Sequence, residues 1–185
     1  MNEEYVKMVS GNLYNPMENY LAKLREETRT KLGIFNSESD ENVREKILKT
    51  LISNIGDKCF ITPNFFCDYG LNIEIGDNVY FNANCVVLDP APVKIGSNTF
   101  IGPNVQIYTP EHPLDYKTRN KGLEWAKPIT IGENCWLGGS VIILAGVTIG
   151  NGSVIGAGSV VTKDIPKNSL TVGNPARVIR TIEQA

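Results

Sequence analysis

The sequence predicts a mainly β protein: a left-handed parallel β-helix built of hexapeptide repeats, with a short α-helical N-terminal segment and a long loop carrying His112. Large apolar residues recur at every sixth position, glycine often follows them, and one long segment interrupts the repeat. Six is neither the helical period of 3.6 nor a simple strand alternation. A β-sandwich with glycine-rich turns would not keep so strict a register. The recurring positions are Ile75, Phe81, Val87, Ile95, Ile101, Ile107, Ile131, Leu137, Ile143, Ile149, Ile155 and Val161.

Each hexad is expected to form one flat side of a triangular coil, with its aliphatic side chain inside the prism. Glycine or asparagine then turns the corner, because corners often need a positive φ that glycine adopts without a Cβ clash. One coil cannot bury its own core, so the coils must stack. The spacing therefore predicts interior columns of aliphatic side chains in residues 55–185.

The first 54 residues have a different pattern and are expected to form short helices. Asn15 is a plausible N-cap with Pro16 at the first helical position, and Met17, Leu21 and Leu24 then share one helical face. These features predict a helix that starts near residue 16.

A second helix is expected over the stretch SESDENVREKILKTLISNIG, capped by Ser39 or Asp40. Gly56 follows closely enough to help end it. Its apolar stripe consists of Val43, Ile47, Leu48, Leu51 and Ile52. We therefore divide the chain into a helical segment, residues 1–54, and a β-helix domain, residues 55–185.

Two breaks in the register are informative. The spacing between Val87 and Ile95 is eight residues, and that between Ile107 and Ile131 is twenty-four, a multiple of six. The second gap holds a segment without hexads, residues 108–130, with three prolines and His112, the only histidine of the chain. Uninterrupted loops of this length are usually functional or disordered, and the prolines and aromatic residues argue against disorder.

Composition excludes several classes of function. Eighteen basic and twenty acidic residues give a net charge of −2, so nothing indicates binding to nucleic acid or to an anionic membrane. The N-terminus lacks the apolar core of a signal peptide, and no apolar stretch is long enough to span a membrane. A soluble cytoplasmic protein is expected. The four cysteines contain no C-x-x-C pair and are expected to be buried and reduced.

The segments YTPEHPLD, FFCDYGLNIEIGDNVYFNANCVVLD and GNPARVIR make the chain similar to the maltose and galactoside O-acetyltransferases, within the hexapeptide-repeat acyltransferase superfamily. The resemblance covers essentially the whole chain. It implies direct acetyl transfer from acetyl-CoA to a sugar hydroxyl in a ternary complex, without a metal. It also implies a homotrimer with active sites between subunits.

The resemblance implies catalytic roles for two residues. The family's catalytic histidine falls on His112, which would remove the proton of the acceptor hydroxyl, and an imidazole titrates close enough to neutral pH to do so. Asn82 matches the asparagine that contacts the acceptor hydroxyl. The acceptor-binding positions fall on Arg25, Asp68 and Tyr80. Glu124 and Trp125 lie at the far end of the loop that carries His112 and are expected to form a wall of the acceptor cleft.

For the coenzyme, the resemblance implies a pantetheine groove near the turn after Leu137 and contacts to the nucleotide at the end of the chain. A backbone N–H near Gly139 would be a natural oxyanion donor, because glycine lets the thioester approach closely. The implied coenzyme-binding residues are Gly102, Trp136, Gly138, Gly139, Thr162, Lys163, Arg177 and Arg180.

Alternative interpretations stay open at this point. Asn82 could be a corner residue, Arg25 a solvated helix charge, Trp125 a loop-packing residue, and the late cations a polar cap of the solenoid. Pro16 and Pro90 stand where some galactoside-type relatives have aspartates, so the sugar is open. The acceptor could instead be an antibiotic, an amino acid or an amino sugar, or the chain could be a non-catalytic trimeric scaffold. A zinc hydratase on this fold would need three histidines, which makes it a poor match.

Overall fold

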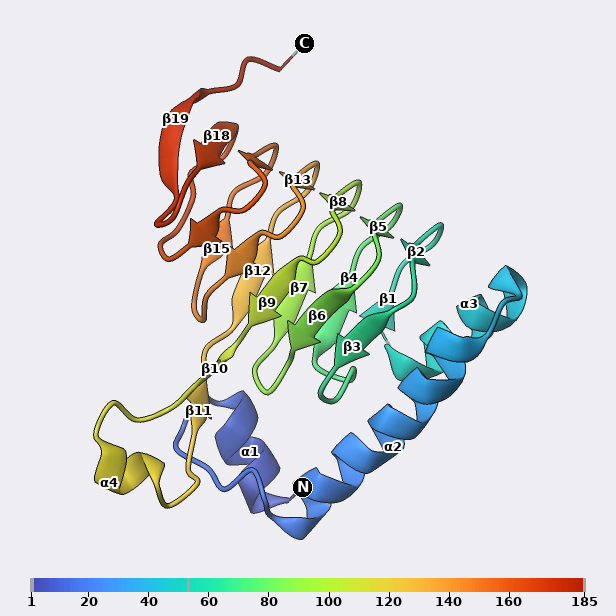
Figure 1. Cartoon of the computed structure of the whole chain (residues 1–185), viewed down its shortest axis with the longest axis vertical. Helices are drawn as coiled ribbons and strands as arrows, with labels where there is room; N and C mark the ends of the chain where they lie inside the picture. Colours follow the sequence, from blue (N-terminus) through green and yellow to red (C-terminus); the bar gives the residue numbers. More distant parts are fainter. Residues whose placement is uncertain (1, 53, 185) are drawn as a thin grey trace.

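The computed structural model describes residues 2–52 and 54–184 and shows a helical N-terminal region followed by a tapering stack of coils (Figure 1). The helices are α1 (Glu3–Val9), α2 (Asn19–Ser37) and α3 (Glu41–Leu51). The hexapeptide β-helix predicted from the sequence is confirmed.

Three parallel sheets form the sides of the β-helix. The first contains β1 (Asn54–Ile55), β4 (Ile73–Ile75), β7 (Val93–Ile95), β12 (Ile129–Ile131) and β15 (Thr148–Ile149). The second contains β2 (Phe60–Ile61), β5 (Tyr80–Phe81), β8 (Phe100–Ile101), β13 (Trp136–Leu137), β16 (Val154–Ile155), β18 (Ser169–Val172) and the antiparallel β19 (Arg177–Thr181). The third contains β3 (Phe65–Cys67), β6 (Cys85–Leu88), β9 (Gln106–Tyr108), β14 (Ile142–Ile143) and β17 (Val160–Val161).

The strand register stacks the recurring apolar residues into interior columns, as the period predicts. On the first sheet one column consists of Ile55, Ile75, Ile95, Ile131, Ile149 and Ile165. Every recurring position predicted to face inward is buried. The prism is therefore filled by its own side chains, and its outer faces and loops are left for binding.

Asparagine or glycine turns the corners, as predicted, while the glycines that directly follow the apolar residues serve close packing between coils. A Cβ on Gly102 would lie 2.6 Å from the backbone nitrogen of Gly139 in the next coil, closer than real side chains approach. The positive φ comes two residues later, as at Asn104 (φ 58°) and Asn134 (φ 56°). Asparagine tolerates a positive φ better than most residues, so it can occupy these corners.

The first long helix starts later than predicted. The Asn15 side chain accepts a hydrogen bond from the Met17 amide in a turn before the helix, and the Glu18 side chain is the N-cap of α2. Met17 therefore lies outside the helix and is 72% exposed, so its placement on the helical face was wrong. Asp40 caps α3 as predicted.

Helices α2 and α3 cover the first coil and share its core through Leu32, Phe35, Leu48, Leu51 and Ile52. Val43 stays exposed, and α3 ends at Leu51, so Gly56 does not act as its cap.

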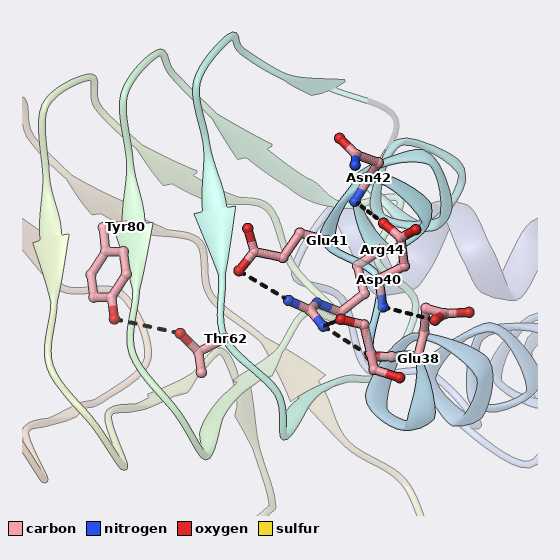
Figure 2. Close-up of polar contacts among 8 residues, drawn as sticks. Glu38, Asp40, Glu41, Asn42, Arg44, Thr62 and Tyr80 are labelled. Atoms are coloured by element: carbon pink, nitrogen blue, oxygen red, sulfur yellow. Dashed lines mark hydrogen bonds and ion pairs between the residues drawn. The ribbon is translucent and has the colours of Figure 1, made fainter.

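The turn between these helices is held by Arg44, which Figure 2 shows reaching back across it. Its guanidinium donates hydrogen bonds to the Glu38 and Ser39 carbonyls at 2.9 Å and 3.0 Å. Its other nitrogen lies 3.6 Å from the Glu41 carboxylate.

The segment 108–130 is an ordered excursion, as predicted, but its internal structure was not foreseen. It contains β10 (Pro110–Glu111) and β11 (Trp125–Ala126), which pair antiparallel, and a short helix α4 (Tyr116–Arg119) between them. The Glu111 carboxylate locks the pair, because one oxygen accepts a hydrogen bond from the Trp125 indole at 2.9 Å and lies 2.6 Å from the Lys127 ammonium. Figure 1 shows this excursion beside α1.

The remaining expectations concern cysteines and membrane spans. All four cysteines are free; Cys67, Cys85 and Cys135 are buried and Cys59 is partly buried. Within residues 2–52 and 54–184 no group of three or more His, Cys, Asp or Glu side chains is arranged to hold a metal ion. In the same ranges, no helix has the length and apolarity that a membrane crossing requires.

Candidate active site

A cleft of about 460 Å³ lies where the N-terminal segment, the first coils and the excursion meet. It brings together four of the predicted site residues, namely Arg25, Asp68, His112 and Glu124. The rest of its wall is Pro16, Met17, Ala22, Arg29, Tyr69, Leu88, Pro90 and Pro110. The cleft is therefore lined by both basic and acidic side chains and by apolar ones.

His112 stands at the open side of this cleft, with its imidazole next to a carboxylate. Its Nε2 lies 3.6 Å from the Glu124 Oε2, and the side chains are 55% and 14% exposed, respectively. That separation is longer than a hydrogen bond, so Nε2 keeps its capacity for a ligand hydroxyl. The arrangement can accept a proton at Nε2 and stabilise the resulting imidazolium by the nearby negative charge.

Glu124 is itself fixed by the N-terminal segment. Its second oxygen, Oε1, accepts a hydrogen bond from the buried Tyr14 hydroxyl. The backbones of the two residues also exchange hydrogen bonds, at 2.9 Å and 3.2 Å, as an isolated antiparallel bridge.

Arg25 comes from α2 and lines the same cleft. Its guanidinium donates hydrogen bonds to the Tyr69 hydroxyl at 2.6 Å and to the Pro16 carbonyl at 2.5 Å, and it lies over the Tyr69 ring, 5.7 Å from the centroid. The solvated-charge interpretation therefore does not describe Arg25.

Asp68 is a half-buried carboxyl group of the cleft, and its backbone amide contacts a second, fully buried carboxyl group, Asp89. Burial and the negative charge of Glu124 raise the pKa of Asp68 to about 6, although two arginines partly oppose the shift. Burial also raises the pKa of Asp89 to about 7, against the hydrogen bonds that it accepts from backbone amides. Burial thus favours the neutral form of both carboxyl groups relative to an exposed aspartate.

The structure places the other predicted residues on a separate part of the surface. Tyr80, Asn82, Gly102 and Trp136 line an apolar hollow of about 440 Å³ on the second sheet, together with Phe100 and Ile101. The Trp136 ring is 57% exposed there. Figure 2 shows the Tyr80 hydroxyl facing Thr62 of the preceding coil, whose hydroxyl lies 3.5 Å away.

The glycines after β13 continue this surface toward the end of the chain. Gly138 and Gly139 pack tightly between coils, and the amide of Gly139 donates no hydrogen bond within the described residues. Thr162, Lys163, Arg177 and Arg180 are exposed. None of these three cations has a carboxylate partner within 4.0 Å in residues 2–52 and 54–184.

Trp125 does not line the cleft, because its indole turns to Glu111 within the hairpin. Sequence reasoning missed Tyr14 and Asp89. Tyr14 directly precedes Asn15, the predicted N-cap, and Asp89 lies in the eight-residue break between Val87 and Ile95, but neither position by itself indicates a role in the site.

Two protein families match parts of the chain. The family described as "Maltose acetyltransferase hexapeptide capping motif" matches residues 7–56, and "Bacterial transferase hexapeptide (six repeats)" matches residues 128–163. The chain is 42% identical to a galactoside O-acetyltransferase of Escherichia coli over 94% of this chain and 86% of that protein.

Solved structures agree with these matches. A maltose O-acetyltransferase of Clostridium difficile superimposes with a TM-score of 0.96 at 47% identity, over 98% of both chains. A hexapeptide-repeat acetyltransferase of Vibrio cholerae, solved as a complex with acetyl-CoA, superimposes with a TM-score of 0.93 at 38% identity, over 99% of this chain and 100% of that one.

Proposed function

We propose an activity for this chain from one premise: it belongs to the maltose and galactoside O-acetyltransferase family of hexapeptide-repeat acyltransferases. It is an acetyltransferase. Its proposed reaction moves the acetyl group of acetyl-CoA to a hydroxyl of a sugar, of the maltose, glucose or galactoside type, in a ternary complex.

The observation that carries this proposal is His112 at the open side of the cleft, 3.6 Å from Glu124. A sugar hydroxyl is a weak nucleophile at neutral pH and needs a base that takes its proton as it attacks. His112 accepts that proton at Nε2, and the Glu124 carboxylate nearby stabilises the imidazolium that forms. Arg25 and Asp68 bind other hydroxyls of the acceptor.

The transfer needs no enzyme nucleophile, because a thioester has a good leaving group. The acceptor oxygen bonds to the carbonyl carbon and the C–S bond breaks. The proton on His112 then passes to the departing thiolate, so the enzyme returns to its initial state. The Gly139 amide is the proposed donor to the developing oxyanion, since it has no partner within the described chain.

Acetyl-CoA is proposed to lie along the second sheet, with its pantetheine arm over Gly102, Trp136, Gly138 and Gly139. Its nucleotide and phosphates then meet Thr162, Lys163, Arg177 and Arg180, whose cations are free to pair with phosphate. In one chain this surface and the His112 cleft are separate. A homotrimer in which His112 of one subunit faces Asn82 and Tyr80 of the next would join them.

The test is thiol release from acetyl-CoA with maltose, glucose, a galactoside and amine acceptors, for the wild type and His112→Ala. Sugar-dependent release that the variant loses would support the proposal. Release only with amines would favour a non-sugar acceptor, and release with none would favour an acceptor outside the tested set or the scaffold interpretation. A wild-type kcat/KM that stays flat across the pH range in which imidazoles titrate would argue against His112 as the base.

A further inference from the structure

Tyr14, in the N-terminal segment before α2, contacts the cleft residue Glu124 from the protein interior. Tyr14 is only 1% exposed, so it cannot contact an acceptor. Its hydroxyl nevertheless donates a hydrogen bond to Glu124, whose other oxygen faces His112. We propose that Tyr14 is a positioning residue that holds the Glu124 carboxylate toward the histidine. This inference rests on the proposed role of His112 as the base.

The backbone fixes where the two side chains meet. The Tyr14 amide donates to the Glu124 carbonyl at 2.9 Å, and the Glu124 amide donates to the Tyr14 carbonyl at 3.2 Å. The reciprocal pair aligns Tyr14 with Glu124 as an antiparallel bridge. The N-terminal segment is thereby attached directly to the end of the excursion that carries His112.

The side chains then divide the two oxygens of Glu124 between them. Oε1 is occupied by the Tyr14 hydroxyl, and Oε2 remains for His112. A carboxylate with one oxygen tied to a buried donor loses rotational freedom, so the position of its charge relative to Nε2 is set before the substrate binds. The position of the Glu124 charge has its largest effect when the imidazole of His112 becomes positively charged during the reaction.

Tyr14 remains a donor throughout the working pH range. Burial, the hydrogen bond to Glu124 and the neighbouring Asp68 and Tyr69 all raise the pKa of Tyr14 above its usual value. The hydroxyl therefore stays protonated. The buried ring packs with Met8, Leu21 and Tyr69 in a small cluster separate from the β-helix core. This packing supports the ring independently of its hydroxyl, so removal of the hydroxyl alone is a clean test.

The experiment compares Tyr14→Phe with Tyr5→Phe, a matched control in the same cluster whose hydroxyl bonds to Asn72 at 2.9 Å. We expect Tyr14→Phe to lower kcat about tenfold, because a misplaced catalytic group affects turnover more than binding. The KM for acetyl-CoA should stay close to wild type, and the melting temperature should fall no further than in Tyr5→Phe, which also loses one hydrogen bond. Tyr5→Phe should keep the wild-type kcat.

A double-mutant cycle with Glu124→Gln separates positioning from a general structural effect. If Tyr14 acts through Glu124, adding Tyr14→Phe to Glu124→Gln should lower kcat little further. Additive losses would overturn the inference, as would a wild-type kcat in Tyr14→Phe or an equal loss in Tyr5→Phe. Full activity of His112→Ala would instead reject the role of His112 as the base. Failure of the Tyr14 inference and failure of the proposed function therefore give different results.

Discussion

The Asp89 carboxylate accepts a hydrogen bond from the backbone amide of Asp68 at 3.0 Å, so one aspartate of the cleft is held by another aspartate beneath it. The same oxygen accepts from the Tyr69 amide at 2.9 Å, and the second oxygen accepts from the Asn72 amide at 3.4 Å. Asp89 is fully buried. It therefore anchors the turn that aims Asp68 into the cleft, although it cannot itself contact a substrate.

Asp89→Asn should weaken both the fold and acceptor binding. Above about pH 7, where Asp89 is ionised, an amide group puts a donor where Asp89 presents an acceptor, so at least one buried backbone amide loses its partner. The free energy of unfolding should fall by about 1–3 kcal/mol, and the KM for the acceptor should rise more than that for acetyl-CoA. Denaturant unfolding and initial rates would measure both effects. The matched control is Asp57→Asn at an exposed aspartate; an equal change in that variant would contradict the anchoring role.

The two raised carboxyl pKa values predict how stability depends on pH. Asp68 and Asp89 have pKa values of about 6 and about 7 in the fold, both raised from 3.8. The folded chain therefore binds more protons than the unfolded chain between these limits. The stabilisation is complete below pH 3.8 and is lost as the pH rises through 6 to 7.

Unfolding measured across this range should show the wild type losing more stability with rising pH than Asp89→Asn, which lacks one titrating group. Parallel pH profiles of the two proteins would contradict the prediction.

The period of six predicted the interior of the prism because each hexad meets the same steric requirement. Ile75, Ile101 and Ile143 lie on different sheets, yet all three are buried where the spacing places them. The residue types at the corners, asparagine or glycine, were predicted, but the packing role of the glycine that directly follows the apolar residue was not. The glycine after the apolar residue is needed because the next coil approaches its backbone closely. The positive φ falls on the corner residue, such as Asn104.

The site was only partly predictable, because its residues come from segments without a period. The long gap placed His112 on an excursion with Glu124 at its far end, and resemblance associated His112 with Arg25 and Asp68; the cleft brings all four together. No local pattern shows that Tyr14 meets Glu124, since 110 residues separate them and the contact depends on how the N-terminal segment packs. The early start predicted for α2 failed because Glu18 competes with Asn15 for the cap.

Replacing Lys163, Arg177 and Arg180 singly by alanine should raise the KM for acetyl-CoA and leave the KM for the sugar nearly unchanged. Each cation is exposed, so its loss removes a phosphate contact without opening the core. An effect of about tenfold is expected for a charge-assisted contact of 1.5–3 kcal/mol that is partly screened by solvent. The control is Lys94→Ala, whose ammonium pairs with Glu74 at 3.2 Å on the first sheet. Equal effects on both substrates would reject the assignment.

Gly102→Ala should disturb the surface proposed for the pantetheine arm, because the new methyl group has no space. It would lie 2.6 Å from the Gly139 nitrogen and 2.8 Å from the Gly138 carbonyl carbon, which are backbone atoms that move only if the coil moves. We expect a lower melting temperature and a higher KM for acetyl-CoA.

Gly33→Ala provides the opposite case, since a Cβ at this position in α2 meets nothing within 4 Å. That variant should gain about 0.5–1 kcal/mol of stability, because alanine loses less conformational entropy in a helix, and should keep wild-type kinetics. If Gly102→Ala behaved like Gly33→Ala, the coils would have enough freedom to absorb a methyl group. That result would show that the close contact between Gly102 and Gly139 does not determine the form of the proposed coenzyme-binding surface.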